Sequence, residues 1–303
     1  MFKLKIHYIN RETNKTEEEK VLGGVFLNWL YSNSLGMGLV ERFFKKKIFS
    51  TLYGQLQDAP FSKRKIAKFI KEYDINMGDY ARSVHEYSSF NDFFARELKE
   101  GARPIDLEKN RLASPADGRV LAYQNIVQDK VLQIKGSYFT LKDLLGSEEL
   151  ARTYDGGSYI VVRLCPTDYH RFHFPDEGTP QKTSLIEGDY YSVSPIALYR
   201  KPQLYCVNKR TLTVFQSRHF DEILYLEVGA CCVGSIVQTY TPGKPVAKGQ
   251  EKGYFKFGGS TVILLFKPGV IQLDADLLNN TEAGLETLVK MGTGLGTALF
   301  PDH

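Results

Sequence analysis

From Arg111 onward the chain breaks into short runs of β-branched and aromatic residues separated by glycine and proline, and this pattern restricts the fold more than any other feature. Such runs are typical of β-strands. We expect strands over residues 131–134, 158–164, 190–193, 212–215, 223–228, 236–240, 254–257 and 261–266. Helical signals in this region are short, over 141–145 and 281–289. The pattern therefore predicts a mostly antiparallel β domain rather than a doubly wound α/β fold.

Residues 21–72 carry apolar side chains at helical spacing and predict two or three amphipathic helices. Residues 41–72 hold nine Lys or Arg and three acidic residues, a net charge of +6 in a chain whose total is +4. Phe43 and Phe44 directly precede three consecutive lysines at 45–47. Apolar side chains beside lysines are typical of a helix that lies in a membrane interface. A helical cap on the protein's own core would show the same pattern.

The sequence therefore predicts an α+β protein in three parts. Residues 1–75 form an N-terminal segment with the amphipathic helices, 76–110 a connector and 111–303 the β-rich domain. No window holds the 18 or more continuous apolar residues of a membrane-spanning helix, and the N-terminus lacks the pattern of a secretory signal. The four cysteines have no CxxC spacing, so we expect reduced thiols in a cytoplasmic compartment.

Two histidines close to the end of an expected strand are candidates for acid–base chemistry. His170 and His173 follow the apolar run 159–164, and side chains at strand ends and in loops often meet substrate. Pro166 and Pro175 flank them, and we expect no metal site. A Walker sequence and a GxGxxG motif that opens a helix are both absent, and no nucleic-acid partner is expected.

Two further segments could carry chemistry. Asp117 lies in a turn bounded by proline and glycine, where an aspartate is often only a turn residue. Gly258 and Gly259 interrupt a strand-like run just before Ser260, which indicates a kink or a close backbone approach. Such a kink could expose the Gly259 carbonyl to the Ser260 hydroxyl. A tight turn between two strands would explain the same glycines.

Four segments together resemble the phosphatidylserine decarboxylases, a family of pyruvoyl-dependent enzymes that cut their own chain. The resemblance covers most of the sequence, in the family's order: FNDFFARELKEGARP at 90–104, PADG at 115–118, DYHRFHFP at 168–175 and GGST at 258–261. The best-known form of the last motif is LGST. Gly258 replaces that leucine here, and the Gly-Ser bond is kept.

The resemblance implies a self-cleavage triad of Asp117, His173 and Ser260. Asp117 would orient and stabilise protonated His173, which would take the proton of Ser260 as in a hydrolase triad. Ser260 would attack the Gly259 carbonyl, and the chain would be cut into a large chain, 1–259, and a small chain, 260–303. Position 260 would become the covalent pyruvoyl cofactor, which forms a Schiff base with the substrate amine. His173 is then the implied proton donor, with His170 as a helper in substrate handling.

The resemblance also implies the partners and the location. The substrate would be phosphatidylserine in an anionic membrane, decarboxylated to phosphatidylethanolamine by a heterodimer of the two cleavage products. We expect peripheral attachment to the cytoplasmic face of the cell membrane, and further dimerisation is left open. Two alternatives use the same sequence. Ser260, His173 and Asp117 could form a serine hydrolase acting on an external ester, although the GxSxG elbow is missing. A non-enzymatic, membrane-binding β module is the second.

Overall fold

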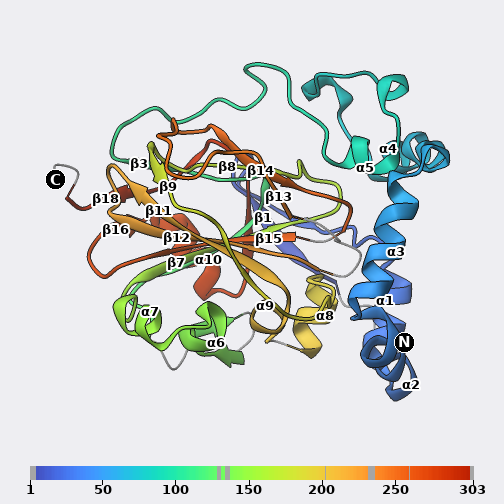
Figure 1. Ribbon diagram of the computed structural model, residues 1–303, viewed down its shortest axis with the longest axis horizontal. Helices are drawn as coiled ribbons and strands as arrows, with labels where there is room; N and C mark the ends of the chain where they lie inside the picture. Colours follow the sequence, from blue (N-terminus) through green and yellow to red (C-terminus); the bar gives the residue numbers. More distant parts are fainter. Residues whose placement is uncertain are drawn as a thin grey trace.

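A ten-stranded sheet runs through the part of the chain that the structure describes (Figure 1). The computed structural model describes residues 5–127, 131–133, 137–201, 203–230, 236–258 and 260–300. The strands of this sheet are β1 (His7–Asn10), β2 (Lys15–Glu18), β4 (Gly118–Tyr123), β7 (Ser158–Leu164), β9 (Gly178–Pro180), β10 (Ser184–Ile186), β11 (Arg210–Ser217), β12 (Glu222–Val228), β15 (Ser260–Phe266) and β17 (Glu286–Val289). Their order is β10-β11-β12-β15-β7-β4-β17-β1-β2, with β9 beside β11.

The centre of the sheet is the antiparallel trio β12, β15 and β7. Every residue of β7 and β15 is buried. Their register pairs Ser260 with Leu164 and Phe266 with Ser158. Fully burying one large apolar side chain stabilises a fold by about 1.5–3 kcal/mol, so these apolar strands form the main core.

Three smaller sheets pack around this core. They contain β13 (Ile236–Gln238), β14 (Glu251–Phe255) and β8 (Arg171–His173); β16 (Ile271–Leu273), β18 (Gly294–Ala298) and β3 (Arg111–Ala113); and β5 (Val131–Gln133) with β6 (Ser137–Phe139). Strand β8 of the first of these sheets carries His173.

Helices α1 to α4 stand along one side of the sheet, at the right of Figure 1. This group consists of α1 (Gly24–Ser32), α2 (Ser34–Leu39), the π-helical turn η1 (Val40–Phe44), α3 (Lys47–Asp58), the 3-10 turn η2 (Pro60–Lys65) and α4 (Ile66–Tyr73). The other helices are η3 (Met77–Asp79), η4 (Val84–Glu86), α5 (Phe90–Phe94), α6 (Leu141–Leu145), α7 (Glu148–Thr153), α8 (Pro195–Arg200), α9 (Leu204–Val207) and α10 (Ala275–Glu282). N-terminal helices followed by mostly antiparallel sheets confirm the α+β class.

The strand expected over 190–193 is wrong. Its backbone groups bond to side chains and to a helical segment instead of a neighbouring strand: the Tyr190 N–H donates to the Lys45 carbonyl at 3.0 Å, and the Tyr191 N–H to Asn208 Oδ1 at 2.9 Å. The strand expected over 158–164 is present with these bounds as β7, and the six others are present with shifted ends, although residue 134 lies outside the described residues.

The helix expected over 281–289 is also wrong. Helix α10 ends at Glu282, and Gly284 follows with a φ of +74°. Glycine adopts this left-handed conformation without steric cost and commonly ends helices. Residues 286–289 then form β17, which pairs antiparallel with β4. The expected helix over 141–145 is confirmed as α6.

The N-terminal segment contributes strands as well as helices. Strand β1 pairs in parallel with β17, with Tyr8 opposite Glu286. Within the described part of the chain, no helix combines the length and the apolar character needed to cross a bilayer. Cys165 and Cys206 are free thiols, and the expectation for Cys231 and Cys232 falls outside the described residues.

Candidate active site

Ser260 is fully buried at the first position of β15. The residue before it, Gly259, lies outside the described residues. Gly258 has a φ of +144°, a backbone conformation that favours glycine over leucine. The chain therefore enters the central strand through a segment whose geometry suits the Gly258 found here in place of the family's leucine.

His170 is the side chain that binds the Ser260 hydroxyl. Its Nδ1 lies 3.1 Å from Ser260 Oγ, and its Nε2 lies 2.9 Å from the Cys165 carbonyl oxygen. Burial, helped by the charge of Arg96, holds the pKa of His170 well below its ordinary value, so the ring is neutral. A carbonyl only accepts, so Nε2 carries the proton and Nδ1 accepts from the Ser260 hydroxyl. His170 is therefore arranged as a base toward Ser260.

His173 is buried nearby on β8 but bonds to other groups. Its Nδ1 donates to the Gly249 carbonyl at 2.9 Å, and its Nε2 accepts from the Tyr169 hydroxyl at 2.9 Å. Burial lowers the pKa of His173, while the Gly249 bond and the charge of Asp117 oppose that shift. The imidazole is thus held neutral with its lone pair on the tyrosine hydroxyl.

Asp117 lies in the turn before β4, and its carboxylate is held by an arginine. Arg103 donates to it from Nη2 at 2.8 Å and from Nε at 3.1 Å, and the Met291 N–H donates at 2.7 Å. Asp117, His170, His173 and Ser260 are the four side chains expected at the site. Of these, the structure joins Ser260 and His170 by a hydrogen bond. The roles assigned to Asp117 and His173 stay predictions.

Helix α5 and the residues after it form part of the site, within the segment expected to be a connector. The ring of Phe94 stacks on His170 with centroids 3.8 Å apart. Arg96 is fully buried and donates to the carbonyls of Thr167 and Asp168, which lie in the loop that leads to His170. Sequence reasoning missed these contacts. The available signal was the phenylalanine-rich FNDFFAR run, whose apolar residues are too many for an exposed linker.

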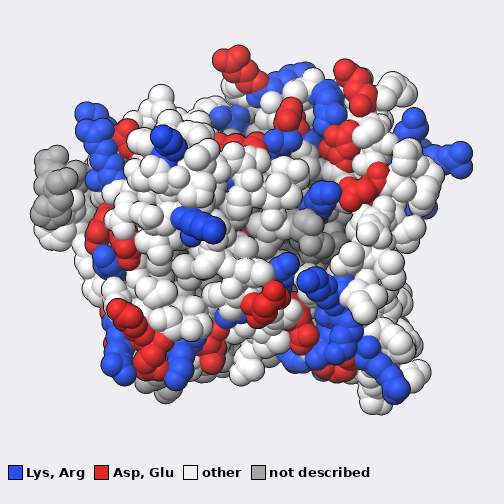
Figure 2. Space-filling model, in the orientation of Figure 1, with Lys and Arg blue, Asp and Glu red and all other residues white. Residues whose placement is uncertain are grey.

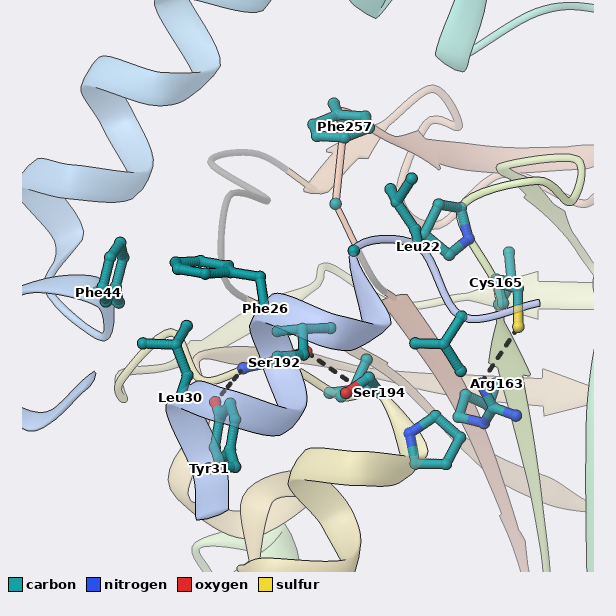
Figure 3. Close-up of a pocket in the computed structure, with 18 of the residues that line it drawn as sticks. Leu22, Phe26, Leu30, Tyr31, Phe44, Arg163, Cys165, Ser192, Ser194 and Phe257 are labelled. Carbon is teal, nitrogen blue, oxygen red and sulfur yellow. Dashed lines mark hydrogen bonds between the residues drawn. The ribbon is translucent and has the colours of Figure 1, made fainter. Parts of the chain in front are cut away.

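An apolar cavity of about 410 Å³ lies between the N-terminal helices and the central sheet. Figure 3 shows Phe26 and Phe44 on one side, Leu22 on the other and Phe257 at one end. Gly258 also lines it, so the cavity reaches the segment that precedes Ser260.

The outer surface of the N-terminal helices exposes many large apolar side chains, which we call the apolar outer face. Its members are Val25, Phe26, Leu35, Phe43, Ile48, Leu52, Leu56 and Phe61. On α3, residues four apart share a face, so the exposed Ile48, Leu52 and Leu56 form one row. Phe49 and Tyr53 of the same helix line the cavity. Helix α3 is therefore apolar toward both the solvent and the cavity.

Basic side chains accompany this face, and Figure 2 shows several of them gathered at its lower right. Lys46 and Lys47 are exposed. Lys45 is not available to a partner in the same way, because its ammonium binds Glu41 at 2.9 Å and Asp189 at 3.1 Å and its side chain is only 18% exposed. Of the three lysines expected at a membrane, two are thus free to meet it.

Comparisons with known proteins indicate the same family that the four sequence motifs resemble. Residues 90–297 match the family model described as phosphatidylserine decarboxylase. A phosphatidylserine decarboxylase proenzyme of Clostridium botulinum is 50% identical over 96% of this chain and 99% of its own length. Proenzymes of the same name from Clostridium perfringens and Clostridium tetani are 50% and 51% identical over 96% of this chain, covering 99% and 98% of their own lengths. The chain therefore belongs to the phosphatidylserine decarboxylase family of enzymes.

Proposed function

We propose that this chain cuts itself between Gly259 and Ser260 and then decarboxylates phosphatidylserine to phosphatidylethanolamine at a membrane surface. Membership of the family supports the decarboxylase activity, and the proenzyme names of its relatives support processing. The observation that most supports self-cleavage is the position of Ser260. This residue directly follows two glycines, it is fully buried, and its hydroxyl lies 3.1 Å from a neutral imidazole.

In the proposed cleavage, Ser260 Oγ attacks the carbonyl carbon of Gly259 as its proton passes to a histidine. The C–N bond breaks, so the peptide becomes an ester and the Ser260 nitrogen becomes an amine. Elimination then removes the Cα proton of residue 260 to a base and breaks the Cβ–Oγ bond, which releases the Gly259 carboxylate and leaves dehydroalanine at position 260. Hydrolysis of that group yields the pyruvoyl group and ammonia. Water is the other reactant, and no oxidant is needed.

The proposed proton acceptor is His173, supported by Asp117, as the family resemblance implies. The charge of Asp117 favours the protonated form of His173, which is what an orienting carboxylate does in a triad. In the structure described, the lone pair of His173 Nε2 accepts from Tyr169. The triad therefore requires this nitrogen to exchange the Tyr169 hydroxyl for that of Ser260.

One observation favours His170 as a second candidate for the acceptor. Its Nδ1 already accepts the Ser260 hydroxyl, and its Nε2 proton is held by the Cys165 carbonyl. Transfer to His170 would need no rearrangement. The two histidines thus lead to different expected results for their variants.

The site fits the covalent group that cleavage would create. Position 260 is fully buried, its side chain contacts His170, and the apolar cavity extends to Gly258. The pyruvoyl group supplies a carbonyl that accepts the electrons released when carbon dioxide leaves. The chain's own part is to bind and orient the lipid, to exclude water and to hold a proton on His173, with His170 beside it.

The proposed substrate is a lipid because the cavity suits an acyl chain. Its lining is dominated by aliphatic and aromatic side chains, such as Leu27, Leu30 and Phe49, and it opens among helices that bear the apolar outer face. One acyl chain could leave the bilayer along α3 and enter the cavity while the headgroup approaches position 260. The exposed apolar side chains could be buried in the bilayer while the exposed lysines meet the headgroups. This combination supports peripheral attachment to an anionic, cytoplasmic membrane surface.

The two chains would stay together after the cut. Strand β15 would begin the small chain, and it lies between β12 and β7 of the large chain. Seven residue pairs join it to β7 and five join it to β12. Because these residues are buried, separating the chains would expose the main core, so a heterodimer is the expected product.

Mass spectrometry of the intact purified protein tests the proposed cleavage directly. We expect chains of residues 1–259 and 260–303, the smaller one carrying a pyruvoyl group in place of serine and therefore closed to Edman sequencing. Conversion of phosphatidylserine in mixed vesicles would be measured on the same sample. A single intact chain of 34.4 kDa would instead agree with the serine hydrolase or the non-enzymatic module.

The membrane contact predicts weaker vesicle binding when Lys46 and Lys47 are both replaced by glutamine. Each exposed charge near an anionic surface contributes about 1 kcal/mol, so we expect roughly a 30-fold loss in partition to anionic vesicles. Sedimentation with phosphatidylserine vesicles measures it. Lys109→Gln with Lys182→Gln, two exposed lysines on other elements, is the matched control. Equal binding by both double variants would place the membrane contact elsewhere.

A further inference from the structure

Asn91 connects the membrane-facing helix to the segment that would be cut. It belongs to α5 and is only 3% exposed. Its Nδ2 donates to the Gly54 carbonyl at 3.2 Å and to Asp58 Oδ1 at 3.0 Å, both in the second half of α3. Its Oδ1 accepts from the backbone N–H of Phe257 at 2.7 Å. One buried amide therefore holds a helix end on one side and the backbone before Gly258 on the other.

Phe257 is anchored through its ring as well as its backbone. The ring lies 5.0 Å from those of Phe90 and Phe94 and 5.9 Å from that of Tyr53, measured between centroids. Phe94 in turn stacks on His170. The same short helix therefore sets both the start of the Gly-Gly segment and the imidazole beside Ser260.

The second anchor lies just beyond the glycines. Ser260 is held in the register of β15, opposite Leu164, so only Gly258 and Gly259 separate the two fixed points. Glycines have more backbone freedom than any other residue. An attacking hydroxyl, however, needs its carbonyl within a near-attack geometry. Two closely spaced anchors can impose that geometry on the chain between them.

We propose that Asn91 is a positioning residue for self-cleavage, acting by tying the Phe257 N–H to the C-terminal half of α3. This inference rests on the proposed self-cleavage at Gly259–Ser260. An amide suits the role because it both accepts from a backbone N–H and donates to a carbonyl and a carboxylate. Aspartate in its place would keep the acceptor but would lose the donors and face Asp58.

The test measures the rate at which full-length precursor, synthesised in a cell-free system, releases the small chain. We expect Asn91→Ala to slow release about 100-fold, the size of effect that a 1 Å misplacement produces. Thr281→Val is the matched control. Its buried hydroxyl also joins a helix to a strand N–H, that of Ala122 at 3.0 Å, far from Ser260 along the sheet. Thermal unfolding of both variants reports the loss of stability.

A charge exchange keeps the test informative if Asn91→Ala folds poorly. Asn91→Asp places two carboxylates together and should process slowly. Asn91→Asp with Asp58→Asn restores a donor opposite an acceptor between these two side chains, but not the donor to the Gly54 carbonyl, and should recover part of the lost rate. Asp58→Asn alone should process normally.

Equal processing rates for wild type and Asn91→Ala would overturn this inference alone, as would a loss in Asn91→Ala that Thr281→Val matches. Failure of the exchange to recover processing would also overturn it. A wild-type chain that stays uncut would overturn the proposed self-cleavage itself, and the role of Asn91 with it.

Discussion

Replacing Ser260 by alanine is expected to leave a single uncut chain with no decarboxylase activity. The substitution removes one buried oxygen, the atom that would attack Gly259, and an alanine cannot eliminate to give dehydroalanine. Both the cut and the pyruvoyl group therefore depend on this hydroxyl. The expected change is therefore from the cut fraction of the wild type to none. Intact-mass measurement and a phosphatidylserine turnover assay read the two outcomes.

Ser158→Ala is the control for this loss. Ser158 is buried in β7 and pairs with Phe266, at the opposite end of the same β7–β15 ladder that begins with Ser260 and Leu164. Ser158→Ala therefore removes a hydroxyl from the same core, but far from the proposed cleavage site. We expect normal processing. Cleavage that persists in Ser260→Ala would remove the assignment of the nucleophile, while loss in both variants would indicate a fold that tolerates no change in this ladder.

The central strands could be predicted because their signal is local. Strands β7 and β15 are continuous apolar runs, as strands covered on both faces are, and they were found with nearly the right ends. Strand β1 could not be found in this way. It joins the sheet by pairing with β17 from the other end of the chain, and Arg11 secures the contact by binding Asp274 and Asp276. Apolar residues alternate at Phe2, Leu4, Ile6 and Tyr8, but this alternation does not report which distant strand the segment pairs with.

The candidate site shows the same division between local and distant information. Residue types and motifs were enough to select Asp117, His170, His173 and Ser260. The hydrogen-bond partners were not, because they come from distant segments: Gly249 holds His173, and Arg103 holds Asp117. The proton positions on the two imidazoles follow from the backbone carbonyls of Cys165 and Gly249, which can only accept hydrogen bonds. The identity of the base at Ser260 therefore depends on tertiary contacts that no spacing in the sequence reports.

The contribution of α5 could not be predicted for a related reason. Five residues are too short for a helical period to be recognised. The segment nevertheless contacts three parts of the site. Asn91 binds Phe257, and Phe94 stacks on His170. Just beyond the end of the helix, Arg96 binds the loop that precedes His170. A short element with few exposed residues can thus organise a site whose histidines and serine lie about 80 and 170 residues away in the chain.

Single replacements of the two histidines are expected to separate their roles. His173→Ala, like Asp117→Asn, should leave mainly uncut precursor, because a general base contributes about 10²–10⁴-fold to such a step. His170→Ala should still be cut, at a reduced rate because the Ser260 hydroxyl loses its acceptor, and should then fail in decarboxylation because of the helper role implied for it. Processing is measured by intact mass over time, and turnover is measured on the fraction that has been cut.

His219→Ala controls for the loss of a buried imidazole. His219 is 9% exposed and binds Asp176 at 3.0 Å, so its removal disturbs a buried pair without touching Ser260; normal processing is expected. The opposite order for the other two variants, with His170→Ala uncut and His173→Ala cut, would assign the proton to His170 and make the Asp117–His173 triad wrong. That result would mean that the 3.1 Å contact between His170 Nδ1 and Ser260 Oγ is already the reactive one. The order found would thus show whether cleavage begins from the hydrogen bonds of the resting chain or only after His173 exchanges Tyr169 for Ser260.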